Sequence, residues 1–188
     1  TRREFLRIIN QESERLTRLI NDVLDLSRID AGEMVWRIEA ISVPDLCRRV
    51  LDTIGVLARS RNQRLDLDTP EGLPEVMADP DRVSQVLTNL LSNAVKFTRE
   101  GGRILVKVDM PEIESVGGSP GMVRLMVADD GIGIPPEEMD TVFERFKQIG
   151  DTLTDKPTGA GLGLTISREI IRHLGGTMWV TSVPGEGS

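Results

Sequence analysis

The chain has 188 residues, a formal net charge of −7, 39% hydrophobic residues and 28% charged residues. These values are typical of a soluble domain with one main core, and an acidic chain without a basic run is unlike a nucleic-acid-binding protein. No apolar run approaches the roughly 18 residues of a membrane-spanning helix. We therefore expect no membrane contact by these residues, while an upstream membrane anchor is left open.

Cys47 is the only cysteine, which excludes an intramolecular disulfide and favours a reducing, cytoplasmic location. Leu46, Val50, Ile54 and Leu57 recur around it at helical spacing. We therefore expect Cys47 to be a buried core thiol rather than a reactive one.

Residues 3–29 predict a long amphipathic helix. Its apolar positions, spaced by three, four or seven residues, are Leu6, Ile9, Leu16, Leu19, Ile20, Val23 and Leu26. One helix cannot bury such a stripe alone, so the pattern favours a partner helix in a dimer or a four-helix bundle. The helix is expected to end near Gly32, which can adopt a left-handed cap.

The rest of the chain alternates between predicted strands and helices. In order, we expect a strand at 34–38, a helix around Cys47 entered through Ser42 and Pro44, strands at 64–68 and 75–78, a helix at 80–98 capped by Asp79, strands at 103–110 and 122–128, a loop at 147–160, a helix at 161–174 and a strand at 177–182. This order predicts an α/β (α+β) fold, a two-layer sandwich with helices covering one face of a mixed sheet, preceded by the long helix.

The predicted helix 80–98 carries two kinds of surface. Its buried stripe is expected to contain Val83, Val86, Leu87, Leu90, Leu91, Ala94 and Val95. Gln85, Asn89, Asn93 and Lys96 recur at i, i+4, i+8 and i+11 and share a second face. Amide oxygens beside an ammonium group suit Mg²⁺ and phosphate, although a solvated helix face explains the same pattern.

A carboxylate pair, Asp129 and Asp130, follows an apolar strand and precedes Gly131 and Gly133. A carboxylate there can accept a hydrogen bond from the exocyclic amine of adenine, and the glycines let the base approach the backbone. A tight turn with a helix cap is the alternative interpretation.

A glycine-rich loop, Gly159, Gly161 and Gly163, leads into the predicted helix 161–174. Its backbone N–H groups and the positive end of the helix can bind phosphate. A single glycine motif is weak evidence, since flexible turns share it. The three features in this order together predict a nucleotide pocket.

These segments resemble the C-terminal half of a bacterial two-component sensor histidine kinase. QVLTNLLSNAVKFT looks like its asparagine box, DDGIGIP its first glycine box, FERFKQ its phenylalanine box and GAGLGLTI its second glycine box. NQESERLTRLINDVLDLSRIDAGEM looks like the second helix of the dimerisation and phosphotransfer domain. The resemblance covers almost all of the chain. It implies an incomplete dimerisation domain at 1–31 and an ATP-binding domain at 32–188, with a lid at about 147–160.

The resemblance also implies a role for each matching residue. Asn93 would bind Mg²⁺ with Asn89 beside it, Lys96 would contact phosphate, Asp129 would bind the adenine amine, Gly131 and Gly133 would shape the base pocket, and Gly159, Gly161, Leu162 and Gly163 would form the lid over the triphosphate of ATP. Phe143 and Phe146 would pack the lid, or serve core packing. Gln148 stands where some relatives carry a phosphate-contacting arginine, for which Arg145 is a candidate substitute.

The family transfers the ATP γ-phosphoryl group to a histidine on the first dimerisation helix, for relay to an aspartate of a response-regulator receiver domain. The kinase is expected to be a homodimer through its dimerisation helices. The only histidine here, His173, falls at the end of the predicted helix 161–174, where the helix dipole favours it. The acceptor is therefore expected outside these residues, and no catalytic residue is assigned within them.

Two alternatives remain. One is a nucleotide-binding module or scaffold without kinase turnover. The other is an ATPase of the gyrase or chaperone type, which uses a glutamate early in the asparagine helix. Ser84 and Gln85 lie near that position, so a base to activate water is absent, and the phenylalanine box favours the kinase. Trp36 and Trp179, on predicted strands, are assigned to packing.

Overall fold

The computed structural model describes residues 2–111, 122–147 and 161–188. In chain order the elements are α1 (Arg2–Asp30), β1 (Glu39–Ile41), α2 (Val43–Ser60), β2 (Arg64–Asp68), β3 (Val76–Ala78), α3 (Pro80–Phe97), β4 (Arg103–Asp109), β5 (Arg124–Asp129), α4 (Pro136–Met139) and α5 (Gly163–His173). The short helix α4 was not predicted. The expected lid residues 148–160 lie outside the described part of the chain.

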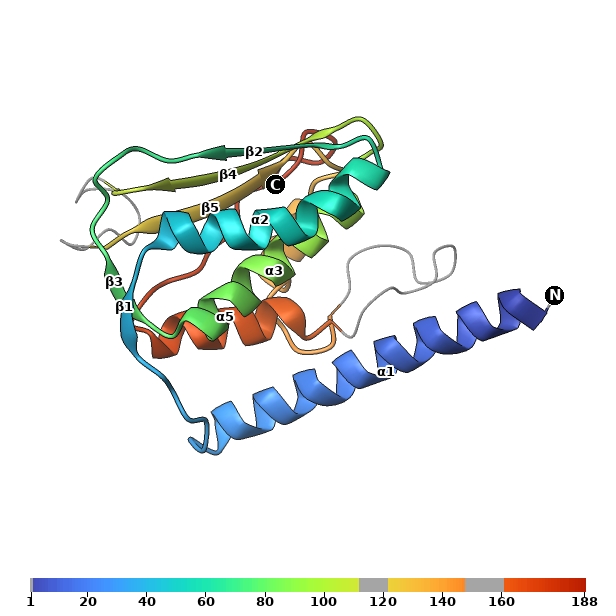
Figure 1. Ribbon diagram of the computed structural model, residues 1–188, viewed down its shortest axis with the longest axis horizontal. Coiled ribbons are helices and arrows are strands. Elements are labelled where there is room, and N and C mark those ends of the chain that lie inside the picture. Colours follow the sequence, from blue (N-terminus) through green and yellow to red (C-terminus); the bar gives the residue numbers. More distant parts are fainter. Residues whose placement is uncertain (1, 112–121, 148–160) are drawn as a thin grey trace.

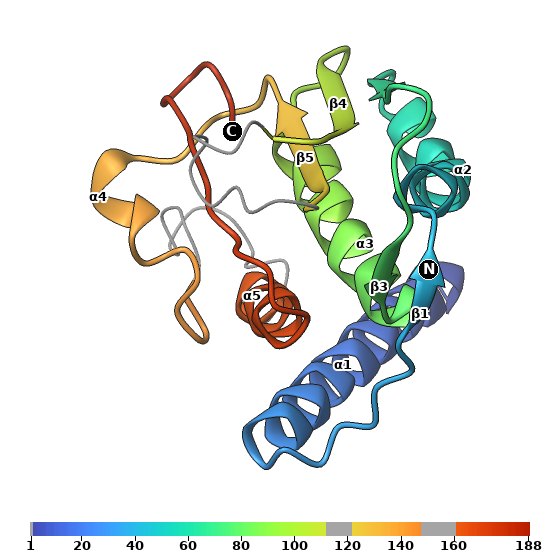
Figure 2. The same ribbon diagram turned by 90° about the vertical axis from the view of Figure 1, so that its left-hand side faces the viewer.

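The predicted fold class is confirmed. Strands β2, β4 and β5 form a mixed sheet in which β4 is parallel to β2 and antiparallel to β5, and β1 pairs with β3 in a separate antiparallel pair. Helices α2 and α3 lie against one face of the sheet, with α5 beyond α3 and α1 beyond α5 (Figure 1). The view from the side shows the same succession of layers (Figure 2).

Helix α3 is buried on two sides, which places it at the centre of the molecule. One side joins α2 and the sheet in the main core, where Leu87, Leu91 and Ile104 are fully buried. The other side, through Val86 and the half-buried Leu90, joins a second cluster with Leu26 of α1 and with Leu162, Ile166 and Ile170 of α5. Helix α3 therefore joins α2 and the sheet on one side to α1 and α5 on the other.

Both predicted helix caps are present. The hydroxyl of Ser42 accepts a hydrogen bond from the Asp45 N–H at the start of α2. At the start of α3, Asp79 Oδ1 accepts from the N–H groups of Asp81 and Arg82, at 3.0 and 3.1 Å. Its Oδ2 accepts from the Arg37 N–H at 2.8 Å, so the same buried carboxylate also ties down the segment after α1.

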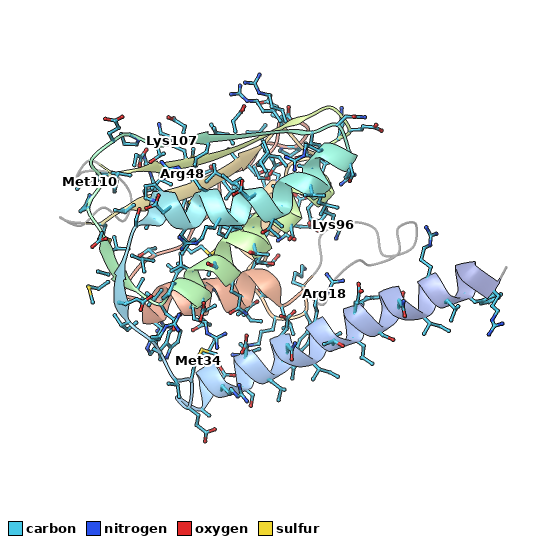
Figure 3. All side chains as sticks on the ribbon, viewed as in Figure 1. Arg18, Met34, Arg48, Lys96, Lys107 and Met110 are labelled. Carbon is cyan, nitrogen blue, oxygen red and sulfur yellow. The ribbon has the colours of Figure 1, made fainter. Side chains whose placement is uncertain are left out.

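The predicted strand at 34–38 is wrong, because the strand lies at Glu39–Ile41. The alternation in this segment reflects burial instead: Met34 is buried and Trp36 half-buried, whereas Val35 is 89% exposed. Figure 3 shows Met34 beside the C-terminal end of α1. The Arg37 N–H donates to the Asp79 carboxylate that caps α3 and is unavailable for pairing with another strand.

The predicted strand at 177–182 is also not formed. Its residues alternate between exposed and half-buried, as in a strand. Within the described residues, however, the C-terminal segment pairs only near its end, where Val183 bridges Gly187 and Asp129 exchanges backbone hydrogen bonds with Ser188. Alternating burial identified an extended segment but could not supply a pairing partner, and Trp179 there is 45% exposed.

Helix α1 is formed as predicted, and Gly32 has the left-handed φ of +68° expected after its end. Among the residues that the structure describes, α1 is docked in the apolar core through Leu26 and Ile29 of its C-terminal part. Many of its apolar residues stay exposed: Phe5, Leu6, Ile9, Leu16, Ile20, Val23 and Leu24. Figure 1 shows α1 extending past the other helices toward the N-terminus. No described helix is both long and apolar enough to cross a bilayer.

Polar contacts reinforce the docking of α1. Asp25 Oδ2 accepts hydrogen bonds from Arg82 at 3.1 Å and from Gln85 at 2.8 Å, both on α3. Asp30 forms a bidentate pair with Arg145, with both N–O distances at 2.8 Å. The Asp25 contact is largely shielded from solvent, whereas the Asp30 pair is half exposed and contributes less.

Cys47 is fully buried, and burial raises the pKa of its thiol to about 11, against a smaller lowering by Arg48. We expect native protein at pH 8 to react with a thiol reagent at least ~100-fold more slowly than the unfolded chain, because little thiolate forms and access is blocked. Following the reaction by absorbance with and without denaturant checks this. Equal rates would contradict the assignment of Cys47 to the core.

Replacing Asp79 tests the cap of α3. We expect Asp79→Ala to lower the free energy of unfolding by about 1–2 kcal/mol, measured by denaturant titration, because buried N–H groups lose their acceptor. Asp81→Ala is the control: its exposed carboxylate pairs with the exposed Arg37 side chain, and we expect a loss of no more than ~0.5 kcal/mol. Equal effects of the two variants would argue against the cap.

The cap also predicts a pH dependence. Burial alone would raise the pKa of Asp79, but the backbone N–H groups of Arg37, Arg82 and Asp81 outweigh it and lower the pKa. A lowered native pKa means that the contribution to stability is complete above the ordinary value of 3.8 and is lost as the pH falls below it. Unfolding titrations between pH 3 and pH 6 should show a larger loss in the parent protein than in Asp79→Ala, in which Asp66 and Asp109, whose pKa values are also lowered, still contribute.

Candidate functional site

The polar face predicted on α3 is present, but its members have different neighbours. Gln85 turns to α1, where its amide donates to Asp25. Asn89 is directed to α5, and Asn93 is half-buried one turn further along α3. Lys96 is exposed at the C-terminal end of the helix, with Nζ 4.4 Å from the centre of the Phe97 ring (Figure 3).

Asn89 connects α3 to the first turns of α5. Its Nδ2 donates a hydrogen bond to Ser167 Oγ at 3.0 Å. Its Oδ1 lies so close to Gly163 that a Cβ at that position would overlap it. Gly163 is therefore required here because any side chain would displace Asn89 or the start of α5.

Asp129 ends β5 and begins a tight turn. Its Oδ1 accepts a hydrogen bond from the Gly131 N–H at 2.9 Å, and within the described residues no other hydrogen bond reaches this carboxylate. Burial raises the pKa of Asp129, the Gly131 N–H partly offsets this, and the neighbouring Asp130 adds to the rise. Asp130 itself is exposed and accepts from the Arg103 N–H at 2.8 Å.

The turn after Asp129 rests on the C-terminal end of α3. The Ile132 N–H donates to the Phe97 carbonyl at 3.3 Å. A Cβ at Gly131 would lie 2.5 Å from Asp129 Oδ1 and 2.6 Å from the Phe97 oxygen, so only glycine permits this approach. The Asp129 carboxylate is thereby held beside the helix that carries Asn93.

The C-terminal segment braces the same turn from the other side. The Ile134 N–H donates to Ser182 Oγ at 2.7 Å, and Ser182 Oγ donates to the Gly187 carbonyl at 2.6 Å. Gly133 has a φ of +68°, and a Cβ there would overlap the Val183 carbonyl. Ser182 was not singled out from the sequence, because nothing in its spacing distinguishes a serine that binds a turn from one that faces solvent.

Gly161, Leu162 and Gly163 lie at the start of α5. Gly161 has a φ of +68°, and its carbonyl accepts from the Phe146 N–H at 3.0 Å. Leu162 is fully buried in the cluster shared with α1 and α3. Within the described part of the chain, α5 has no side-chain cap, because its N-cap residue, Leu162, has no polar side-chain atom to accept from the first N–H groups. Gly159 lies outside the described residues.

The residues of the phenylalanine segment differ in environment. Phe143 is buried, and its carbonyl accepts hydrogen bonds from Thr165 at 2.9 Å and from Arg168 at 3.3 Å. Phe146 is 65% exposed within the described structure. Arg145 is engaged by Asp30 of α1. Gln148 and any contact of these residues with the expected lid lie outside the described residues.

The geometry brings two backbone turns to one helix. The Asp129 turn contacts α3 at Phe97, and the start of α5 contacts it at Asn89. Asn93 occupies the stretch of α3 between these two contacts. A groove of about 260 Å³ between α2 and β2, lined by Leu51, Asp52, Gly55, Ala58, Arg59, Gln63 and Leu65, contains none of these residues.

Few charged side chains that could ligate a metal ion lie near Asn93 in the described structure. Among the residues that the structure describes, no three His, Cys, Asp or Glu side chains are grouped to hold a metal ion. One amide oxygen on α3 fits a cation that takes its other ligands from phosphate and water, which is how Mg²⁺ is held in nucleotide sites. A cation that needs a complete set of protein ligands does not fit.

Two family models match the chain. Residues 78–188, more than half of the chain, match the histidine kinase-, DNA gyrase B- and HSP90-like ATPase family. Residues 1–32 match the His Kinase A (phospho-acceptor) domain. The first match covers α3, β4, β5, α4 and α5, and the second covers α1.

Individual proteins show the same relationship. The chain is 33% identical over 184 residues to the sensor histidine kinase WalK of Bacillus subtilis, an alignment covering 98% of this chain and 29% of WalK. The chain spans less than a third of the length of the curated relatives it matches.

Two solved structures have the same fold. Full-length ShkA in complex with AMPPNP has a TM-score of 0.81 at 31% identity, covering 98% of this chain and 36% of ShkA. Histidine kinase ThkA in complex with the response regulator protein TrrA has a TM-score of 0.74 at 26% identity, covering all of this chain and 49% of that one. The chain therefore belongs to the histidine kinase-, DNA gyrase B- and HSP90-like ATPase family, and it is similar over nearly its whole length to sensor histidine kinases.

Proposed function

We propose that this chain binds Mg·ATP and serves as the catalytic part of a sensor histidine kinase, with a dimerisation-domain segment at 1–31 and the nucleotide-binding domain at 32–188. The observation that carries the proposal is the convergence of the Asp129 turn and the start of α5 on α3, one on each side of Asn93. The AMPPNP complex of ShkA supports the choice of nucleotide.

Asp129 is proposed to select adenine. One carboxylate oxygen is occupied by the Gly131 N–H, which leaves the other to accept a hydrogen bond from the exocyclic amine of the base. Gly131 and Gly133 keep the turn free of side chains that would displace the base. Because Asp129 is half-buried, its hydrogen bond to a ligand is shielded from water and is worth more than an exposed one.

Phosphate binding is proposed for the start of α5 and the end of α3. The uncapped N–H groups of α5 beside Gly161, Leu162 and Gly163 carry the positive end of the helix dipole. Lys96 is proposed to offset phosphate charge and Asn93 to ligate Mg²⁺. When bound, the metal would neutralise charge on the phosphates as the γ-phosphoryl group is transferred. Gly159 and the lid at 147–160 remain part of the proposal from sequence.

The acceptor is proposed to be a histidine of a phospho-acceptor domain, with onward transfer to a response-regulator aspartate and dimerisation through helices such as α1. The exposed apolar residues of α1 and the ThkA–TrrA complex support these partners. His173 is unsuited to be the acceptor, because it ends α5 and its ring stacks on Trp36 with a centroid separation of 3.9 Å.

Asp129→Asn should weaken binding of Mg·AMPPNP by about 10- to 100-fold in calorimetric titration. The amide oxygen would keep the Gly131 N–H, so the amide nitrogen would face the adenine amine, donor against donor. Asp130→Asn is the matched control, because an amide oxygen can still accept from the Arg103 N–H, and we expect no more than about a twofold change. A folded parent protein that binds no nucleotide would contradict the proposed function, and equal affinities of parent and Asp129→Asn would contradict the role of Asp129.

The raised pKa of Asp129 gives this variant a second signature. A carboxyl whose native pKa is raised favours folding in its neutral form, so its contribution to stability falls as the pH rises through the native pKa. We therefore expect Asp129→Asn without nucleotide to be as stable as the parent, or more stable, at pH 7. Denaturant titration measures this, and a marked loss of stability would assign Asp129 to the fold rather than to ligand binding.

Incubation of the chain alone with Mg²⁺ and γ-labelled ATP should give no acid-labile, alkali-stable label, because His173 is the only histidine and is stacked on Trp36. His173→Gln should behave as the parent does. Acid-labile label on the parent that disappears in His173→Gln would make His173 an acceptor and overturn the assignment.

A further inference from the structure

We propose that Ser167 is a positioning residue of the nucleotide site and acts through Asn89. This inference rests on the proposed function and deepens it. Nothing in the sequence marked Ser167, which lies four residues after Gly163 on the face of α5 that meets α3. Its hydroxyl accepts the Asn89 Nδ2–H at 3.0 Å, and its side chain is only 2% exposed.

The side-chain amide of Asn89 contacts α5 at two positions, Gly163 and Ser167, which are about one helical turn apart. Ser167 holds the nitrogen end of the Asn89 amide, and the oxygen end lies against Gly163. Both ends of the amide therefore face α5. This geometry makes Asn89 a joint between α3 and α5 and leaves Asn93 as the amide available to a metal ion.

The Asn89–Ser167 hydrogen bond fixes the register between α3 and α5, which apolar packing alone does not. Val86 on α3 packs with Ile166 and Ile170 on α5, but such contacts have no preferred direction and tolerate sliding or rotation. A hydrogen bond in a buried site fixes one register, because a shift would leave the Asn89 amide without its partner. The start of α5, which is proposed to bind phosphate, is thereby set relative to Asn93.

A matched control lies on the same helix. Thr165 is as buried as Ser167, and its hydroxyl donates to the Phe143 carbonyl at 2.9 Å instead of contacting Asn89. Thr165→Val therefore removes one buried hydrogen bond of α5 without touching the joint. Any general weakening of α5 should appear in both Thr165→Val and Ser167→Ala.

The test is a double-mutant cycle on AMPPNP affinity, measured by calorimetry with and without Mg²⁺. We expect Ser167→Ala to weaken binding about 2- to 10-fold, the range of one neutral hydrogen bond. In an Asn89→Ala background the same change should have no further effect, because the joint is already broken. Asn93→Ala should abolish most of the gain in affinity from Mg²⁺, whereas Ser167→Ala should preserve that gain.

Thr165→Val should show the opposite pattern, with an effect that adds to that of Asn89→Ala. Additive effects of Ser167→Ala and Asn89→Ala, or no effect of Ser167→Ala in a parent that binds AMPPNP, would overturn this inference and leave the proposed function standing. A parent that binds no AMPPNP would overturn both.

A second measurement does not depend on nucleotide. In the parent, the side-chain amide protons of Asn89, assigned by NMR through their loss in Asn89→Ala, should exchange slowly with solvent. Their exchange rate should be higher in Ser167→Ala than in the parent and the same as the parent's in Thr165→Val. Fast exchange in the parent would show that the joint does not exist in solution.

Discussion

The structure depends on burying α3 on two adjoining sides. Leu87 and Leu91 face the sheet and α2, while Val86 faces α5 and α1. The polar residues are therefore confined to the part of the helix surface that these two contacts leave uncovered. That part carries Asn89 and Asn93. Because the Asp129 turn and the start of α5 both contact α3 directly, the positions of the proposed ligand groups among the described residues follow from how this one helix is packed.

Local patterns predicted the elements whose signals lie within their own stretch of sequence, even where the partner lies far away, as for β2 and β4. The strand at 64–68, both helix caps and the helix 80–98 followed from alternation, cap residues and periodicity. The strands expected at 34–38 and 177–182 failed because alternation reports burial, whereas a strand also needs a neighbour with matching N–H and carbonyl groups. Arg37, for example, gives its N–H to Asp79, 42 residues away.

The candidate site divides in the same way. Residue types on α3 and in the glycine turns were sufficient to predict a nucleotide site, because their chemistry is visible in the sequence. The hydrogen-bond partners of those residues could not be predicted. Gln85 donates to Asp25 of α1, Asn89 donates to Ser167, and Arg145 pairs with Asp30. Each of these contacts joins elements far apart in the chain, and no spacing rule could have paired them.

The measurement that tests the arrangement most directly is amide hydrogen exchange of the chain with and without Mg·AMPPNP. Binding at the junction on α3 should slow exchange in the Asp129 turn and in the first turn of α5, and leave the groove between α2 and β2 unchanged. Protection of that groove, around Gly55 and Gln63, without protection of the Asp129 turn would place the nucleotide elsewhere and contradict the central role of α3.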